Sequence, residues 1–98
     1  MTTKRAFVDL FKKPDEDVKT LFELVTKAGG TVEATYGNPQ VERAAILQGP
    51  ARLIEHLERE GHQGIFSIHT GEVPGGYLLL DHTVRVAADI WNREVTGG

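Results

Sequence analysis

The order of hydrophobic periodicities in the first seventy residues restricts this chain to few folds. Segments with the apolar pattern of strands are interleaved with segments whose apolar residues recur every three or four positions, as in helices. The expected order is strand, helix, two strands, helix, strand, over the ranges Arg5–Phe11, Pro14–Ala28, Thr31–Tyr36, Val41–Leu47, Ala51–Glu60 and Ile65–His69. This order predicts an α+β, ferredoxin-like βαββαβ fold, in which helices cover one face of an antiparallel sheet.

The first helix has the clearest pattern of these elements. Three acidic residues follow Pro14 and complement the positive end of the helix dipole. Gly29-Gly30 can adopt the left-handed backbone conformation that ends a helix. The apolar residues that share its expected buried face are Val18, Leu21, Phe22 and Val25. After this helix, alternation places Val32, Ala34 and Tyr36 on one face of a strand, and the turn signal Gly37-Asn38-Pro39-Gln40 predicts a hairpin.

The residues after 70 predict a loop from Gly71 to Gly76, a short strand at Leu78–Leu80 and a terminal helix. Asp81 is placed to cap that helix. The apolar stripe of the helix consists of Val84, Ala87, Ala88 and Trp91. The second face of the sheet is also apolar, and we expect this helix or a second subunit to cover it. Because a chain of 98 residues buries only a modest core, we predict a homodimer.

Composition limits the class of protein. With 98 residues, 40% hydrophobic and 26% charged, the chain is long enough for a single globular domain over residues 1–98. It has no cysteine, which excludes disulfides and thiolate metal sites. A net charge of −3 argues against nucleic acid as a partner. Apolar runs are too short for a membrane helix and no signal-peptide core is visible, so we expect a soluble cytoplasmic protein without membrane contact.

Few residues carry candidate chemistry. Asp9 lies inside an apolar strand, where a carboxylate could ligate a hard cation, although an exposed or ion-paired Asp9 is the commoner arrangement. His69 ends a strand and could reach a pocket, or it could be a structural histidine whose ring nitrogens are hydrogen-bonded within the fold. Arg85 could bind a phosphate or carboxylate, or form a surface ion pair with Asp81 or Asp89. The spacings predict no P-loop, helical zinc pair or nucleophile turn.

Several segments resemble the class III nucleotidyl cyclase homology domain, whose core is also ferredoxin-like. The stretch 29–38, GGTVEATYGN, resembles the Gly-Gly, strand and Gly-Asp-Gly hairpin of that family. The stretch 68–73, IHTGEV, is similar to its following strand and loop, and 49–54, GPARLI, resembles the start of its next helix. More weakly, 6–10 resembles its first metal-binding strand and 81–88 its transition-state helix.

This resemblance implies an incomplete catalytic site. Asp9 matches the first metal-binding aspartate of the family, and Asn38 stands where the second aspartate is expected. Ala34 corresponds to the base-selecting lysine, and Asp81 to the transition-state asparagine, while Arg85 matches the arginine. Two-metal catalysis needs paired carboxylates. The resemblance therefore implies a degenerate, non-catalytic relative, in which Asp9 is at most a weak metal ligand.

Three functions remain open from the sequence. The first is a non-catalytic regulatory or small-ligand-binding domain that acts as a dimer and needs no cofactor, with Asp9, Tyr36, Asn38, His69 and Arg85 as candidate binding residues. The second is a small dimeric α/β-barrel enzyme. The segment from Leu24 to Gly37, a helix, Ala-Gly-Gly and a strand, also resembles a part of that group of proteins. There Asp9, Tyr36 and His69 would line one cavity, with His69 as general base. The third is a structural protein-interaction domain.

Overall fold

The structure, a computed structural model, describes residues 2–38, 40–75 and 80–97. Its elements follow one another as β1 (Thr3–Asp9), α1 (Asp15–Lys27), β2 (Thr31–Asn38), β3 (Glu42–Pro50), α2 (Ala51–Gly64), β4 (Ser67–His69) and α3 (His82–Thr96). The four strands form one sheet in the order β2-β3-β1-β4, with antiparallel pairing throughout. This arrangement confirms the predicted α+β class and is consistent with the ferredoxin-like fold.

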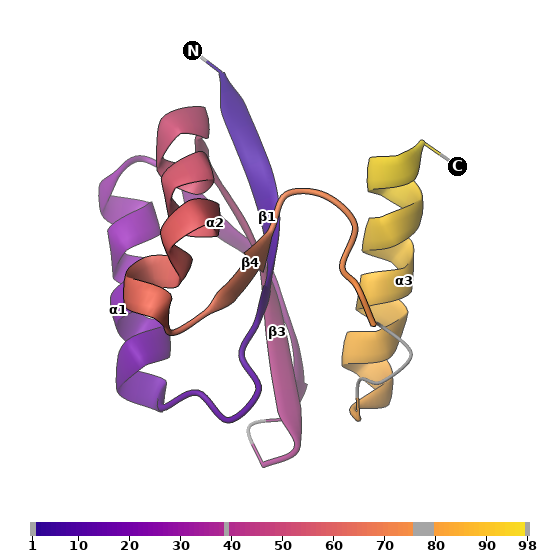
Figure 1. Cartoon of the computed structure of the whole chain (residues 1–98). Helices are drawn as coiled ribbons and strands as arrows, with labels where there is room; N and C mark the ends of the chain where they lie inside the picture. Colours follow the sequence, from indigo (N-terminus) through magenta and orange to yellow (C-terminus); the bar gives the residue numbers. More distant parts are fainter. Residues whose placement is uncertain (1, 39, 76–79, 98) are drawn as a thin grey trace.

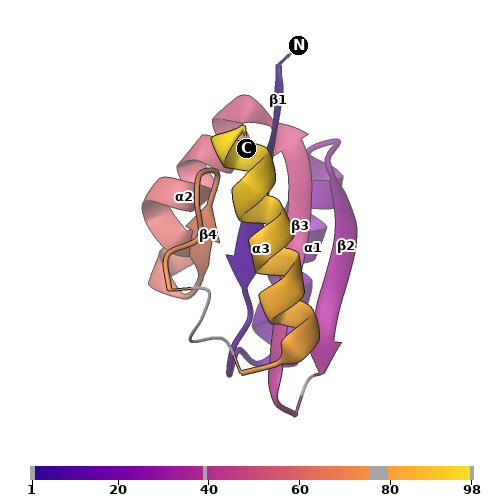
Figure 2. The same cartoon turned by 90° about the vertical axis from the view of Figure 1, so that its right-hand side faces the viewer.

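The sheet lies between α1 and α2 on one side and α3 on the other (Figure 1). It separates two hydrophobic clusters. Helices α1 and α2 cover one face, where Val8 of β1 and Leu47 of β3 pack against Leu21 and Ile54. Helix α3 covers the other face and runs roughly along the strands (Figure 2). On this face Phe7 packs against Trp91. The successive residues Phe7 and Val8 belong to opposite clusters because side chains alternate along a strand.

The terminal helix confirms the prediction for the C-terminal region. Its predicted apolar stripe, Val84, Ala87, Ala88 and Trp91, is buried against the sheet. The Asp81 side chain accepts a hydrogen bond from the Val84 N–H, as expected of an N-cap. Because α3 covers the apolar second face, that face no longer argues for a second subunit, and the homodimer stays a prediction. The expected short strand at Leu78–Leu80 falls mostly outside the described residues.

Several boundaries differ from those predicted. Strand β1 ends at Asp9 and not at Phe11, because the Asp9 carboxylate accepts the Phe11 N–H at 2.9 Å and Lys12 turns the chain with φ 58°. Strand β3 continues to Pro50, where it pairs with Thr3. In α2, regular helix ends at Glu60, as predicted, and the following residues Gly61–Gln63 take left-handed angles. The predicted strand from Ile65 shortens to Ser67–His69.

A β-bulge in β2 corrects the predicted faces of that strand. Val32 pairs with Leu47, and Ala34 pairs with Ile46, so that Glu33 is an extra residue in β2. The extra residue reverses the alternation. Val32 therefore packs toward α1 and α2, whereas Tyr36 packs toward α3. The prediction that Val32, Ala34 and Tyr36 share one face is wrong.

Candidate functional site

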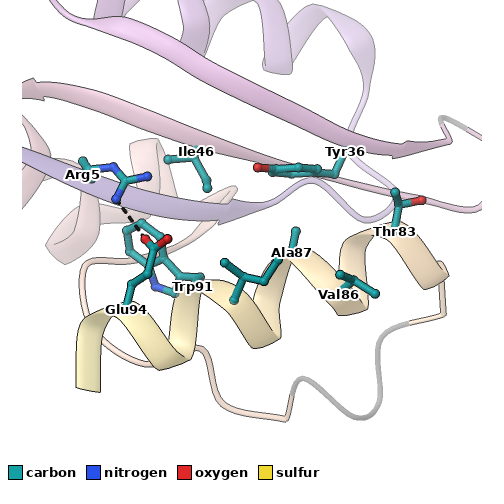
Figure 3. Close-up of a pocket in the computed structure, with 9 residues that line it drawn as sticks. Arg5, Tyr36, Ile46, Thr83, Val86, Ala87, Trp91 and Glu94 are labelled. Carbon is teal, nitrogen blue, oxygen red and sulfur yellow. Dashed lines mark hydrogen bonds and ion pairs between the residues drawn. The ribbon is translucent and has the colours of Figure 1, made fainter. Parts of the chain in front are cut away.

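A cleft of about 180 Å³ lies between α3 and the part of the sheet near β2 (Figure 3). Tyr36 of β2 and Ile46 of β3 form its sheet wall. Its helix wall includes Val86 and Ile90, which are large apolar side chains yet 41% and 49% exposed. Single exposed apolar residues are ordinary on protein surfaces, but two of them on one rim of a concave apolar site are typical of binding sites.

The bulge at Glu33 creates this cleft. Without the extra residue, Tyr36 would point toward α1, because it would share the face of Val32. In the observed register Tyr36 lies opposite Ala44, whose small side chain leaves room beside the ring. Figure 3 shows the Tyr36 ring lying along the sheet with one face toward α3.

An ion-pair cluster closes one end of the cleft. The Arg5 Nε–H donates to a Glu33 carboxylate oxygen at 2.8 Å, and an Nη1–H donates to Glu94 at 3.1 Å. The guanidinium also lies over the Trp91 ring, 5.4 Å from its centroid. The hydrogen bond to Glu33 is the main cause of a raised Arg5 pKa, to which Glu94 adds. Arg5 of β1 thus connects β2 with α3 at the surface.

Helix α3 also holds the loop that follows β4. The Trp91 indole N–H donates to the Gly71 carbonyl at 2.8 Å. The Asn92 side chain accepts the Val73 N–H at 2.7 Å and donates to the Val73 carbonyl at 3.2 Å. The Thr70 N–H and hydroxyl both donate to the Glu58 carboxylate. The segment 68–73, which carries the resemblance to cyclases, therefore forms structural contacts along most of its length.

Asp9 and His69 lie on the α3 side of the sheet but do not line the cleft. In the pairing of β1 with β4, His69 lies opposite Phe7 and Ser67 lies opposite Asp9. One Asp9 carboxylate oxygen accepts the Phe11 N–H. The enzyme alternative requires Asp9, Tyr36 and His69 in one cavity, and this cleft contains only Tyr36 of the three.

Asn38 and Arg85 also lie outside the cleft. The Asn38 side-chain oxygen accepts the Gln40 N–H at 2.8 Å, which is a local turn interaction. Asn38 pairs with Glu42 while Asp9 pairs with Ala44, so strand β3 lies between the two residues that match the metal positions of the cyclases. Arg85 lies on an exposed part of α3.

Glu42 is a structural residue that the sequence analysis missed. It is only 4% exposed, and its carboxylate accepts the Leu80 N–H at 2.7 Å and the Asp81 N–H at 3.3 Å. These bonds fix the start of α3 to the start of β3. The available signal was an acidic residue shortly before the apolar run Ala44–Leu47 of a strand, where a buried carboxylate needs hydrogen-bond donors.

The described ranges 2–38, 40–75 and 80–97 contain neither a metal-binding group nor a membrane-spanning helix. In these ranges no three His, Asp or Glu side chains form a group that could hold a metal ion. The metal role predicted for Asp9 thus gains no support from neighbouring ligands in this part of the chain. In the same ranges no helix combines the length and the apolar character needed to cross a bilayer.

The cap of α3 leads to a prediction on acid stability. Hydrogen bonds from the Thr83 hydroxyl and the Val84 N–H lower the Asp81 pKa below its usual value. A lowered folded-state pKa adds stability that is complete above the unfolded pKa of about 4 and is lost as the pH falls through the folded value. We expect Asp81→Asn, which keeps the cap oxygen, to flatten this acid dependence. Urea unfolding at several pH values between about 2 and 6 gives the free energy of unfolding at each pH. If this free energy changed with pH equally in both proteins, the prediction would be contradicted.

Neither a scan against protein-family models nor searches of curated proteins and of solved structures found a match for this chain. The resemblance to the class III nucleotidyl cyclase domain stays a prediction.

Proposed function

We propose that this protein is a non-catalytic binding domain that holds a small, largely apolar molecule in the cleft between α3 and the β2 side of the sheet. The single observation that carries the proposal is the arrangement of Tyr36, Val86 and Ile90 around a concave space of about 180 Å³. Burying such surfaces against a ligand removes apolar area from water. A regulatory role and dimer formation stay predictions beside it.

The placement of the polar residues supports binding rather than catalysis. The acid and base residues that the enzyme alternative requires, Asp9 and His69, are outside the cleft. The charged residues at its end, Arg5 and Glu94, are bonded to each other. A dimeric α/β barrel would pack two sheets face to face, on the face that α3 covers here.

Trp91 provides a direct test, because it lines the cleft and is the single tryptophan of the chain. We expect 2-phenylethanol to change Trp91 fluorescence in a saturable titration. For about nine non-hydrogen atoms at roughly 0.5 kcal/mol each, Kd should lie near 1 mM. Tyr36→Ala should weaken binding about tenfold, because it removes the aromatic wall, whereas Tyr36→Phe should retain binding.

Phe22→Ala is the matched control for the loss of an aromatic ring. Phe22 is half-buried like Tyr36 but packs against the cluster on the α1 and α2 side. It should leave the Kd for 2-phenylethanol unchanged, provided that melting shows each variant folded at the assay temperature. Absence of saturation in the wild type, or an equal weakening by Phe22→Ala, would contradict the proposed cleft and favour an interaction domain without a ligand.

A further inference from the structure

The charged end of the cleft has more negative than positive groups. Arg5 shares its guanidinium between the carboxylates of Glu33 and Glu94, so these three residues together carry one net negative charge. Glu94 lines the cleft itself and is about half exposed. An incoming cation can approach Glu94 without breaking the pair with Arg5, because each carboxylate oxygen accepts more than one hydrogen bond.

An anionic group at the same end would face a different situation. To reach Arg5 it would have to compete with two carboxylates that already accept guanidinium hydrogen bonds at 2.8 and 3.1 Å. The Arg5 guanidinium also lies over the Trp91 ring, so the ring covers one of its faces. Arg5 keeps further N–H donors, but an anion that approached them would also face the carboxylates of Glu33 and Glu94, which outnumber the one guanidinium.

The aromatic wall favours a flat apolar body beside the charged end. The face of the Tyr36 ring is turned toward α3 across the cleft (Figure 3). A ring face of this kind packs well against another aromatic ring or an aliphatic group. The apolar side chains of Ile46, Val86 and Ile90 are then left to contact an uncharged body.

From these features we infer that the ligand class is a cationic amphiphile: a small aromatic or aliphatic body with one ammonium group. This inference rests on the proposed function and specifies its ligand. The ammonium group lies near Glu94, and the body lies against Tyr36, Ile46, Val86 and Ile90.

Three probes of similar size separate charge from shape. They are 2-phenylethylamine, 2-phenylethanol and phenylacetate, which present the same ring with a cationic, a neutral and an anionic end. We expect the amine to bind about fivefold more tightly than the alcohol, from one exposed ion pair with Glu94, and phenylacetate to bind most weakly. Titrations followed by Trp91 fluorescence at about 0.15 M salt limit the contribution of distant charges.

Glu94→Gln tests the residue responsible for the preference. It should reduce the amine-to-alcohol ratio of affinities from about fivefold to about one. Asp89→Asn is the matched control, because it removes the same charge from α3 outside the cleft, and it should leave the ratio at about fivefold.

The outcomes separate the two proposals. Equal affinities of amine and alcohol, tighter binding of phenylacetate, or an equal effect of Asp89→Asn would overturn the ligand class while the binding cleft stands. Failure of all three probes to bind would overturn the proposed function and the ligand class with it.

Discussion

Trp91→Ala is expected to lower the free energy of unfolding by about 3–5 kcal/mol, the usual cost of removing a buried large aromatic side chain. The Trp91 side chain is 2% exposed and its ring contacts Phe7 with centroids 6.2 Å apart. Its indole N–H also holds the Gly71 carbonyl. Because these contacts join α3 to β1 and to the loop after β4, the substitution should weaken the docking of the whole helix. Urea unfolding followed by circular dichroism measures the change.

Trp91→Phe separates packing from hydrogen bonding in this result. It keeps an aromatic ring against Phe7 but leaves the Gly71 carbonyl without its indole donor. We expect a smaller loss of about 1–3 kcal/mol, which combines the missing hydrogen bond with the reduced volume. An unfolding free energy that is unchanged in Trp91→Ala would show that α3 does not pack on the sheet.

Gly37→Ala is expected to destabilise the protein by about 3 kcal/mol, for a reason of both conformation and space. Gly37 has φ 90°, which is unfavourable for a residue with a Cβ. An added Cβ would overlap the carbonyl oxygen of Glu42 and lie 2.7 Å from Cγ2 of Val84. Relieving this overlap must move either β3 or α3, and such overpacking commonly costs about 1–3 kcal/mol. Thermal and urea unfolding both report it.

Gly29→Ala is a closely matched control for this substitution. Gly29 has φ 91°, almost the same as Gly37, but an added Cβ there would have no other atom within 4 Å. The control therefore carries the conformational cost alone, about 1–2 kcal/mol. Equal losses in the two variants would contradict the close approach of α3 and β3 to Gly37.

Helices were the elements that the sequence predicted best. The apolar positions of α1 and α3 recur at helical spacing, and the structure buries Val18, Leu21, Val25 and the stripe from Val84 to Trp91 as expected. Periodicity works there because a helix that packs on a sheet must present one apolar face. The order of elements also predicted the sheet topology, since few connections join such an order into one sheet.

The faces of β2 could not be predicted from alternation. A bulge adds one residue without changing the polar and apolar pattern, and its position at Glu33 depends on pairing with β3. The end of β1 was misplaced for a similar reason, because the Asp9 carboxylate accepts a hydrogen bond from the Phe11 N–H and this ends the strand. Neither event leaves a periodic signal in the sequence.

The candidate site was predicted only in part. Tyr36 was among the expected binding residues and lines the cleft, while Asp9, Asn38, His69 and Arg85 lie outside it. Arg5 and Glu94 were missed because they are 89 positions apart in the chain and meet only through the docking of α3. Val86 and Ile90 were missed because exposed apolar residues beside a buried stripe resemble an ordinary helix surface.

The most direct test of this account is a map of where 2-phenylethylamine binds, obtained from intermolecular NOEs and amide shift changes in the folded protein. Binding in the proposed cleft predicts NOEs from the probe to Tyr36, Val86 and Ile90, with the largest amide shifts in β2 and α3. Contacts centred on Asp9 and His69, or shifts spread evenly over the sheet and all helices, would contradict it.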